Sequence, residues 1–322
     1  MDVVEYPGDK IDAIGRLRVG KRDLKLAIEV KALPTKAYTG YLYQKFTRNL
    51  PADQGLLVAE YINPVMAERL KEHGIWFMDA AGNAYINKPP LYIYVKGNKQ
   101  AETVGKETRP RAFQTMGLKL IFAFLCRPDL VNAPYREIAE VAGVALGTVG
   151  WIITDLKDMG YIVEIDKRKR QLKGRKKLFH RWVEAYPEQL SPKLLIGKYT
   201  TTEPTWWKNT KFKKLAAYLG GEIAAEFLTH YLTPEIKTVY VREKPQELLL
   251  AFKLRKDPHG DVELLKAFWN IKCDNINNKG MDKKIVHPIL VYADLLATGD
   301  PRNIETADMI YAKNIAEHLR ED

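Results

Sequence analysis

Apolar positions in the first hundred residues follow two periodicities, one typical of strands and one of helices. Short apolar or alternating runs predict strands at residues 12–19, 24–31, 55–61, 75–78 and 91–95. Apolar residues at helical spacing predict helices at 36–49 and 64–73. Strands alternating with helices are typical of an α/β domain, which we assign to residues 1–100.

The pattern changes after a turn-rich, charged stretch at residues 97–111. Residues 111–183 form the second predicted domain, with helices at 116–126, 135–142 and 146–159, then strands at 161–165 and 177–182 around a basic loop.

A second turn-rich stretch at residues 185–210 precedes the third predicted domain, residues 190–322. One predicted helix there has six apolar residues on one face: Phe212, Leu215, Leu219, Ile223, Phe227 and Tyr231. Strands are predicted at 238–242 and 248–254, and a C-terminal helix with Asp300 as its N-cap and Pro301 at its first position. The chain is therefore expected to be an α+β protein of three domains.

Charge adds a local feature to this pattern. The chain has a formal charge of +11, and nine of the fifteen residues from 167 to 181 are Lys or Arg with no acidic residue among them. A basic run in the middle of the chain indicates a nucleic-acid contact more than a solvated tail.

Composition sets further expectations. No apolar run reaches the roughly 18 residues of a membrane span and no signal-peptide pattern is seen, so we expect a cytoplasmic protein without a membrane partner. Cys126 and Cys273 stand apart from any metal-ligand spacing and are expected to be buried free thiols. No nucleotide-binding motif is present, and no cofactor is expected apart from Mg²⁺ in a nuclease.

The second domain has the plan of a helix-turn-helix. The helix at 135–142, the turn Gly143-Val144-Ala145 and the helix from Leu146 predict a DNA reader, and a hairpin with its tip at 167–176 would be the wing. Residues 111–182 thus resemble bacterial winged-helix regulators. The alternative is a winged helix that docks RNA or a protein.

Eleven residues are predicted to contact DNA. Gly147, Thr148 and Trp151 would reach base edges from the third helix, although Trp151 could instead be packed. The basic residues of the wing would contact phosphates: Lys167, Arg168, Lys169, Arg170, Lys173, Arg175, Lys176 and Lys177.

The first domain carries a candidate nuclease site. A hairpin closed by Gly20-Lys21 places Asp12 opposite Glu29, with Lys31 on the same side. In this register the opposite face of the hairpin is apolar along its whole length, from the pair Ile11 and Val30 to the pair Leu17 and Leu24. Asp12 with Glu29-Val30-Lys31 resembles the PD-(D/E)xK nuclease core, which implies metal binding by Asp12 and Glu29.

The resemblance also assigns Lys31 to orienting the attacking water and Gln44 to the position of a glutamine common in such nucleases. Ile11 replaces the motif's proline, and Glu29 and Lys31 pointing outward from a strand need have no function.

Three other features have two readings. Asp79, Gly82 and Asn83 are expected to form a tight turn rather than a ligand site. Gly220-Gly221-Glu222 interrupts an otherwise regular helix and indicates either tight packing or a binding surface. Trp206-Trp207 would anchor the third domain to the second or lie on an interaction surface.

Two sequence blocks are the most specific, Gly74–Tyr85 with its Asp-Ala-Ala-Gly-Asn run and Val291–Arg302 with its Tyr-Ala-Asp-Leu-Leu run. With Gly55–Ala59 and the winged helix they resemble the longer branch of the AbiEi-type antitoxins and transcriptional regulators of type IV toxin–antitoxin systems. The resemblance implies an autorepressor that counteracts a nucleotidyltransferase-like toxin without forming a tight complex with it. Binding to paired half-sites would indicate a homodimer. The competing hypothesis is a metal-dependent DNA endonuclease, and the third is a protein-interaction scaffold.

Overall fold

A computed structural model describes the chain at residues 2–5, 11–20, 22–31, 34, 39–40, 42–43, 45–46, 54–99, 111–166, 169–203, 205–208, 215–242, 245–271 and 285–320. The described residues form a mixed α/β structure with three separate sheets. The chain divides into two compact units, Met1–Thr108 with Leu296–Ile304, and Arg109–Leu295 with Glu305–Asp322. Segments 111–183 and 190–322 thus fall mainly in one unit, and their separation into two domains stays a prediction.

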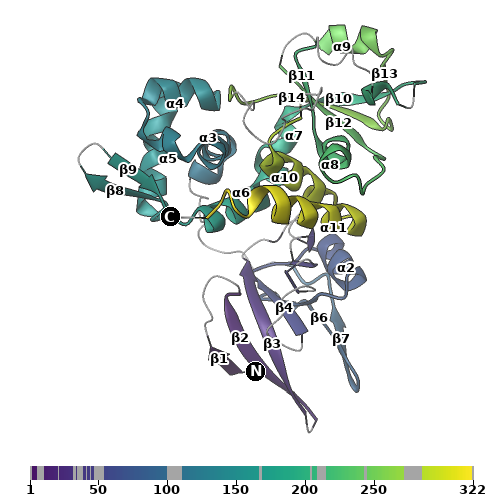
Figure 1. The fold of residues 1–322 in the computed structure, drawn as a ribbon. Coiled ribbons are helices and arrows are strands. Elements are labelled where there is room, and N and C mark those ends of the chain that lie inside the picture. The colour runs from purple at the N-terminus through teal and green to yellow at the C-terminus, as the bar shows by residue number, and fades with distance from the viewer. Residues whose placement is uncertain are drawn as a thin grey trace. The chain divides into compact units, whose positions relative to one another are not determined.

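The first unit is built on a seven-stranded mixed sheet whose strands are ordered as in the chain (Figure 1). Its elements are β1 (Asp2–Glu5), β2 (Ala13–Val19), β3 (Arg22–Lys31), β4 (Gln54–Ala59), α2 (Pro64–Glu72), β5 (Trp76–Asp79), β6 (Ala84–Lys88) and β7 (Leu91–Val95). The central strands β3, β4 and β5 are parallel, and the other neighbours are antiparallel. All five strands predicted for this segment are present, whereas β1 and β6 were not predicted.

The β2–β3 hairpin has the register expected from the sequence. Ala13 pairs with Ile28, Gly15 with Leu26, and Leu17 with Leu24. The alternation of apolar residues was sufficient to predict this pairing because a slip by one residue would exchange the two faces.

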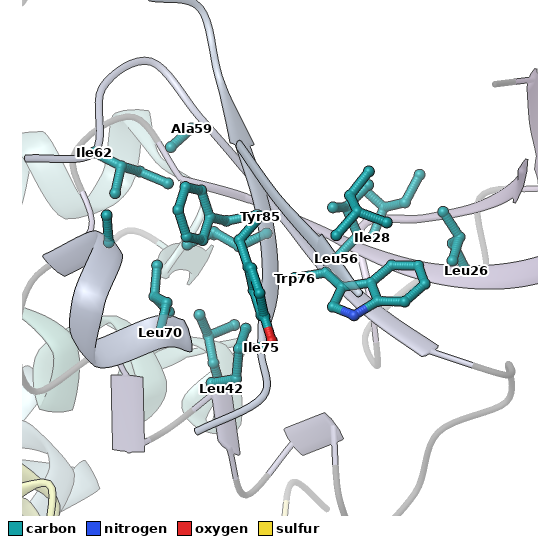
Figure 2. Close-up of a cluster of buried hydrophobic side chains, with 14 of the residues drawn as sticks. Leu26, Ile28, Leu42, Leu56, Ala59, Ile62, Leu70, Ile75, Trp76 and Tyr85 are labelled. Atoms are coloured by element: carbon teal, nitrogen blue, oxygen red, sulfur yellow. The ribbon is translucent and has the colours of Figure 1, made fainter. Parts of the chain in front are cut away.

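The main core of this unit lies between the sheet and helix α2. Figure 2 shows Leu26 and Ile28 of β3, Leu56 of β4, Trp76 of β5 and Tyr85 of β6 in one cluster of buried side chains. Helix α2 contributes Met66, Ala67 and Leu70, and it begins where the Asn63 side chain accepts the N–H of Met66 at 2.9 Å. Residues 39–40, 42–43 and 45–46 are helical, inside the helix predicted for 36–49.

The expectation that Glu29 points outward is wrong. Glu29 is buried, with 4% of its surface exposed, while Val30, predicted to continue the apolar face, is 57% exposed. The reason is a second apolar cluster of Ile11, Ile14 and Ala27 with Phe46, which covers the other face of β3. The alternation of apolar and polar residues along one strand does not reveal that other side chains cover both faces of that strand.

The second unit contains most of the helices and the other two sheets (Figure 1). Its first part comprises η1 (Arg111–Phe113), α3 (Thr115–Cys126), η2 (Pro128–Asn132), α4 (Tyr135–Ala142), α5 (Leu146–Asp158), β8 (Ile162–Asp166), β9 (Lys169–Leu172), α6 (Arg175–Gln189) and α7 (Ser191–Leu194). The next part comprises β10 (Leu195–Thr200), η3 (Trp206–Lys208), β11 (Ala217–Leu219), α8 (Gly221–Thr229), β12 (Lys237–Val241), α9 (Pro245–Ala251), β13 (Arg255–Lys256) and β14 (Val262–Lys266). The chain closes with α10 (Pro288–Thr298), α11 (Pro301–Ile310) and the π-helical turn η5 (Tyr311–Ile315).

The five-stranded sheet of this unit has the order β11-β12-β14-β10-β13, with only the β12–β14 pair parallel. The single helix predicted from Phe212 to Tyr231 is wrong, because Ala217–Leu219 is strand β11 and helix α8 starts at Gly221. The glycine pair therefore marks a strand–helix junction. Gly221 has φ +48°, and a Cβ on Gly220 would lie 2.5 Å from the Tyr240 ring, which confirms the tight-packing reading.

The strand predicted at 248–254 is also wrong, because residues 245–251 form helix α9. Leu248 and Phe252 are buried while Leu250 is 81% exposed, a pattern of helical period. Leucine also favours helix over strand. Asp300 caps α11 as predicted, its Oδ1 accepting the N–H groups of Arg302 and Asn303 at 2.9 and 3.3 Å.

The tryptophan pair is part of the core of the second unit. Trp206 packs on Phe252 with ring centroids 4.9 Å apart, and Trp207 packs on Phe227 at 5.5 Å. Both are buried, so the interpretation as an interaction surface is wrong. Cys126 is buried, as predicted, while Cys273 and the predicted site residues Gln44, Lys167 and Arg168 lie outside the described residues. Among the described helices, none is by itself long and apolar enough to cross a membrane.

Candidate nucleic-acid interface

Helices α3, α4 and α5 form a tightly packed group. Ile138 of α4 and Val149, Ile152 and Leu156 of α5 are almost fully buried. Trp182 of α6 anchors the group, because its indole N–H donates to the carbonyl of Leu118 at 2.8 Å and its ring stacks on Phe122. This packing gives α5 one buried side and leaves its other side outside the core.

The turn between α4 and α5 bends the chain by 98°. Gly143 ends α4 with φ +65°, and a Cβ there would lie 2.5 Å from the carbonyl oxygen of Phe268. Asn270 completes the end of α4, its backbone N–H donating to the Val141 carbonyl at 2.9 Å and its side chain to the Glu140 carbonyl at 2.8 Å. The segment after β14 thus holds the angle between the two helices.

The first turns of α5 are accessible. Trp151 is 62% exposed, Gly147 is exposed and Thr148 is half-buried. Trp151 therefore does not belong to the core, so the alternative that this residue only packs in the interior is wrong. The Arg111 guanidinium lies over its ring, 5.1 Å from the centroid.

The hairpin that follows α5 is shorter than predicted. β8 pairs with β9, but Lys177–Trp182, predicted as the second strand, lies in helix α6. Gly174, with φ +62°, ends the hairpin and begins α6, whose buried residues Leu178, Phe179, Trp182, Val183 and Tyr186 follow a helical period. The basic run is therefore divided between a hairpin and the first turn of a helix.

The structure places the basic residues of the run in two sets. Lys169 is exposed on β9. The Arg170 guanidinium lies over the Tyr135 ring, 5.3 Å from its centroid, and the backbone N–H of Arg170 donates to Asn132 Oδ1 at 2.7 Å. Lys173 follows the hairpin. Arg175, Lys176 and Lys177 start α6, and the Arg175 guanidinium donates to the His318 carbonyl at 3.3 Å.

Most of these cations are not neutralised within the described part of the chain. No ion pair there involves the charged groups of Lys169, Arg170, Lys173, Lys176 or Lys177. The acidic residue Glu164 of β8 pairs instead with Lys157, whose hydrogen bond lowers the pKa of that carboxyl. The hairpin and the start of α6 therefore present net positive charge.

A hollow of about 640 Å³ adjoins the exposed side of α5. Gly147, Thr148 and Trp151 of α5 line this hollow, and Arg111, Thr115 and Lys193 are among its other lining residues. Sequence reasoning found the first three residues but missed Arg111 and Lys193, since they lie outside the dense basic run.

Three residues of the nuclease hypothesis, Asp12, Glu29 and Lys31, lie in the described part of the chain, and two of them have other partners. The Asp12 carboxylate accepts the backbone N–H of Val30 at 2.8 Å, and Glu29 forms an ion pair with Lys45. Lys31 is half-buried at the end of β3. Across the described residues, no group of three or more His, Cys, Asp or Glu side chains could hold a metal ion.

The Asp79–Asn83 segment is the tight turn predicted from the sequence. Gly82 has φ +84°, and the Asp79 carboxylate accepts the backbone N–H of Asn83 at 2.8 Å and that of Ile62 at 2.7 Å. Asn83 is fully buried and bonds Asn98. The Asp79 and Asn83 side chains are thus both used in structure.

A polar cluster not expected from the sequence surrounds Asp294 in the Val291–Arg302 block. Its Oδ1 accepts the hydroxyls of Tyr186 and Tyr240 at 3.0 and 2.8 Å, and its Oδ2 accepts the Gly221 N–H at 3.2 Å. Burial raises the pKa of Asp294 to about 7, although these hydrogen bonds oppose the rise. The cluster joins α6, β12, α8 and α10.

Residues 171–316 match the family model described as "Transcriptional regulator, AbiEi antitoxin, Type IV TA system". The matched stretch runs from β9 to η5 and includes the Val291–Arg302 block. This stretch is thus similar to a family of transcriptional regulators.

Within that class, the stretch belongs to the AbiEi antitoxins of type IV toxin–antitoxin systems, which confirms the family recognised from the sequence. Helices α3, α4 and α5 and residues 1–108 of the first unit lie outside the match. The chain has no significant match among curated proteins or among solved structures.

Proposed function

We propose that this protein is a DNA-binding autorepressor in which α3, α4, α5 and the β8–β9 hairpin act as a winged helix-turn-helix. The observation that carries the proposal is α5 itself, which is packed on one side and exposes Gly147, Thr148 and Trp151 on the other. A second helix set at a steep angle after a glycine turn is the usual arrangement for entering a major groove.

Affinity in this proposal comes from the basic residues of the hairpin and of the start of α6. Among the described residues, the charges of Lys169, Arg170, Lys173, Lys176 and Lys177 form no ion pair. Glu164 faces Arg170 across the hairpin but is already paired with Lys157, so the cations stay available to phosphates. Phosphate contacts position the duplex but do not read its sequence. Specificity would come from Thr148 and Trp151, whose side chains can reach base edges.

The protein's own operon is the expected DNA target, because the matched family comprises regulators that are also antitoxins. A homodimer would bind paired half-sites about 10 base pairs apart, or a multiple of this spacing. The functional partner is a nucleotidyltransferase-like toxin in the cytoplasm. The reading frame beside this gene tests that part directly, since it should encode such an enzyme.

DNA binding is tested by fluorescence anisotropy with the DNA upstream of the gene and with a random duplex, over a range of salt concentrations. Replacing Lys167, Arg168, Lys169 and Arg170 by alanine should weaken binding to both duplexes and flatten the salt dependence, by about 0.9 in log–log slope for each phosphate that the variant no longer neutralises. Thr148→Ala should instead reduce discrimination between them by about 1–3 kcal/mol if Thr148 contacts a base.

An unchanged salt slope would remove the hairpin from the interface. Equal losses on both duplexes would show that Thr148 has a structural role. Absence of binding to either duplex by the unmodified protein at low salt would contradict the proposal and favour a protein-interaction scaffold.

A metal-dependent endonuclease is the second candidate function. It is favoured by the register of β2 and β3, because Asp12 directly precedes the first residue pair of this hairpin, Ala13 with Ile28. In that case the winged helix would deliver DNA to Asp12, Glu29, Lys31 and Gln44. The ion pair between Glu29 and Lys45 weighs against it, because a metal ion would have to displace the ammonium.

A further inference from the structure

Two cations at the hollow beside α5 are held in place by neutral groups. The Lys193 ammonium donates to the hydroxyl of Thr115, and that hydroxyl donates to the carbonyl of Gln189 at 2.9 Å. The Arg111 guanidinium rests on the exposed Trp151 ring. Both side chains are exposed, and neither forms an ion pair with a carboxylate in the described ranges.

Two further lysines add positive charge from α3 and β14, and neither has a carboxylate partner among the residues that the structure describes. Lys119 is one turn after Thr115 on the same face of α3, and Lys266 ends β14. Burial and the neighbouring charge of Lys266 lower the pKa of Lys119, so these two ammonium groups repel each other. An anion bound between them would remove this repulsion.

The four cations extend the positive surface beyond the hairpin. Arg111, Lys119, Lys193 and Lys266 all lie outside residues 167–181, which hold the basic run. Arg111 and Lys193 line the hollow beside α5, and Lys119 lies one turn from Thr115, the hydroxyl partner of Lys193. Unpaired like charges that are close together are typical of a surface that binds a polyanion. The hollow is wider than a single phosphate needs and can admit a sugar–phosphate unit beside the indole ring.

We infer that Arg111 and Lys193 bind a backbone phosphate of the DNA at this hollow, next to the groove entered by α5, and that Lys119 and Lys266 contact the phosphates that follow. The inference rests on the proposed DNA-binding function and adds a second line of phosphate contacts, from η1, α3, α7 and β14. The duplex would then be held on both sides of the recognition helix.

The test compares the full-length protein with the double variant Arg111→Gln and Lys193→Gln by anisotropy at several salt concentrations. Removing two cation–phosphate interactions should reduce the log–log salt slope by about 1.8, that is, by about 0.9 for each cation. Specific and random duplexes should lose affinity by the same factor. Because both side chains are exposed, thermal unfolding should be nearly unchanged.

Two control variants separate charge from other effects. The double variant Arg111→Lys and Lys193→Arg keeps both charges and should retain most of the salt slope. Lys256→Gln removes one charge from an exposed lysine on the edge strand β13 and should leave the slope unchanged. A slope reduced equally by Lys256→Gln would indicate a general effect of net charge and overturn the inference.

Three further outcomes would overturn the inference, and they differ in what they say of the proposed function. An unchanged slope in the Arg111 and Lys193 double variant, with a reduced slope in the hairpin variant, leaves the proposed function intact. Displacement of DNA by millimolar ATP from the unmodified protein, but not from that double variant, would assign the hollow to a free nucleotide. No binding of DNA by the unmodified protein at low salt would remove both proposals.

Discussion

Asp294 shows how one buried carboxylate can connect distant parts of the second unit. It bonds two tyrosine hydroxyls and one backbone N–H, and Glu263 adds a further unfavourable charge. Burial disfavours the ionised form, so the folded protein takes up a proton at Asp294 at a higher pH than the unfolded chain does.

The first prediction concerns the pH dependence of stability. The folded pKa of Asp294 is about 7 and the reference value is 3.8, so the folded state binds more protons between these values. The contribution of this group to the free energy of unfolding is therefore largest at low pH and is lost as the pH rises towards 7. Urea unfolding at pH 5, 6, 7 and 8 should show the unmodified protein losing stability relative to Asp294→Asn.

The Asn variant serves as its own reference, because all other titrating groups are common to both proteins. A difference in unfolding free energy that is the same at every pH would show that Asp294 is ionised throughout the range. Tyr186→Phe, which removes one hydrogen bond to the carboxylate, should raise the pKa of Asp294 further and shift the transition to higher pH.

Local chemistry was predictable for single residues whose partners are close in the sequence. Asp79, Gly82 and Asn83 form the expected turn, and Asp300 caps α11 as expected, because both motifs depend on a few neighbouring backbone groups. The burial of Glu29 was not predictable, since it depends on a second layer that covers the sheet.

At the scale of elements, the junction between α4 and α5 depends on one glycine. Gly143 takes a positive φ, and the backbone of Phe268 leaves no room for a side chain. The turn therefore needs glycine for two reasons, its conformation and its close contact.

Gly143→Ala should destabilise the protein by about 1–2 kcal/mol from the left-handed backbone alone, with more from the contact. Gly147→Ala is a matched control, because a Cβ at this helical position meets no atom within 4 Å. It should be neutral or stabilising, by up to about 1 kcal/mol. Chemical denaturation measures both, and equal effects would contradict the role given to Gly143.

Three elements were assigned to the wrong class, for related reasons. α6 and α9 were interpreted as strands because their apolar residues are dense over short windows. β11 was merged with α8 because an apolar residue every three or four positions continues across Gly220. Short apolar runs fit both periods, so tertiary pairing decides between them.

At the scale of the whole molecule, both candidate functions use the same basic surface but differ at Asp12 and Glu29. Asp12 is engaged by a backbone N–H and Glu29 by Lys45. Both carboxylates therefore already have partners in the folded chain.

We predict that purified protein incubated with supercoiled plasmid and Mg²⁺ or Mn²⁺ leaves the DNA intact while retarding its migration. The Asp12→Ala variant should give the same pattern. Nicked or linear plasmid that disappears in the Asp12→Ala control would instead establish metal-dependent cleavage by this site.

The sequence alone determined the features that arise from neighbouring residues: the helices α3, α4 and α5, the β2–β3 register, the two turn motifs, the dense basic run and the family of residues 171–316. Only the tertiary structure decided the short hairpin, the exposure of Trp151 beside Arg111, the burial of Glu29 and the Asp294 cluster. The physical reason is range. Periodicity, capping and turns depend on residues a few positions apart, whereas burial and charge pairing depend on which distant segments pack against a given side chain.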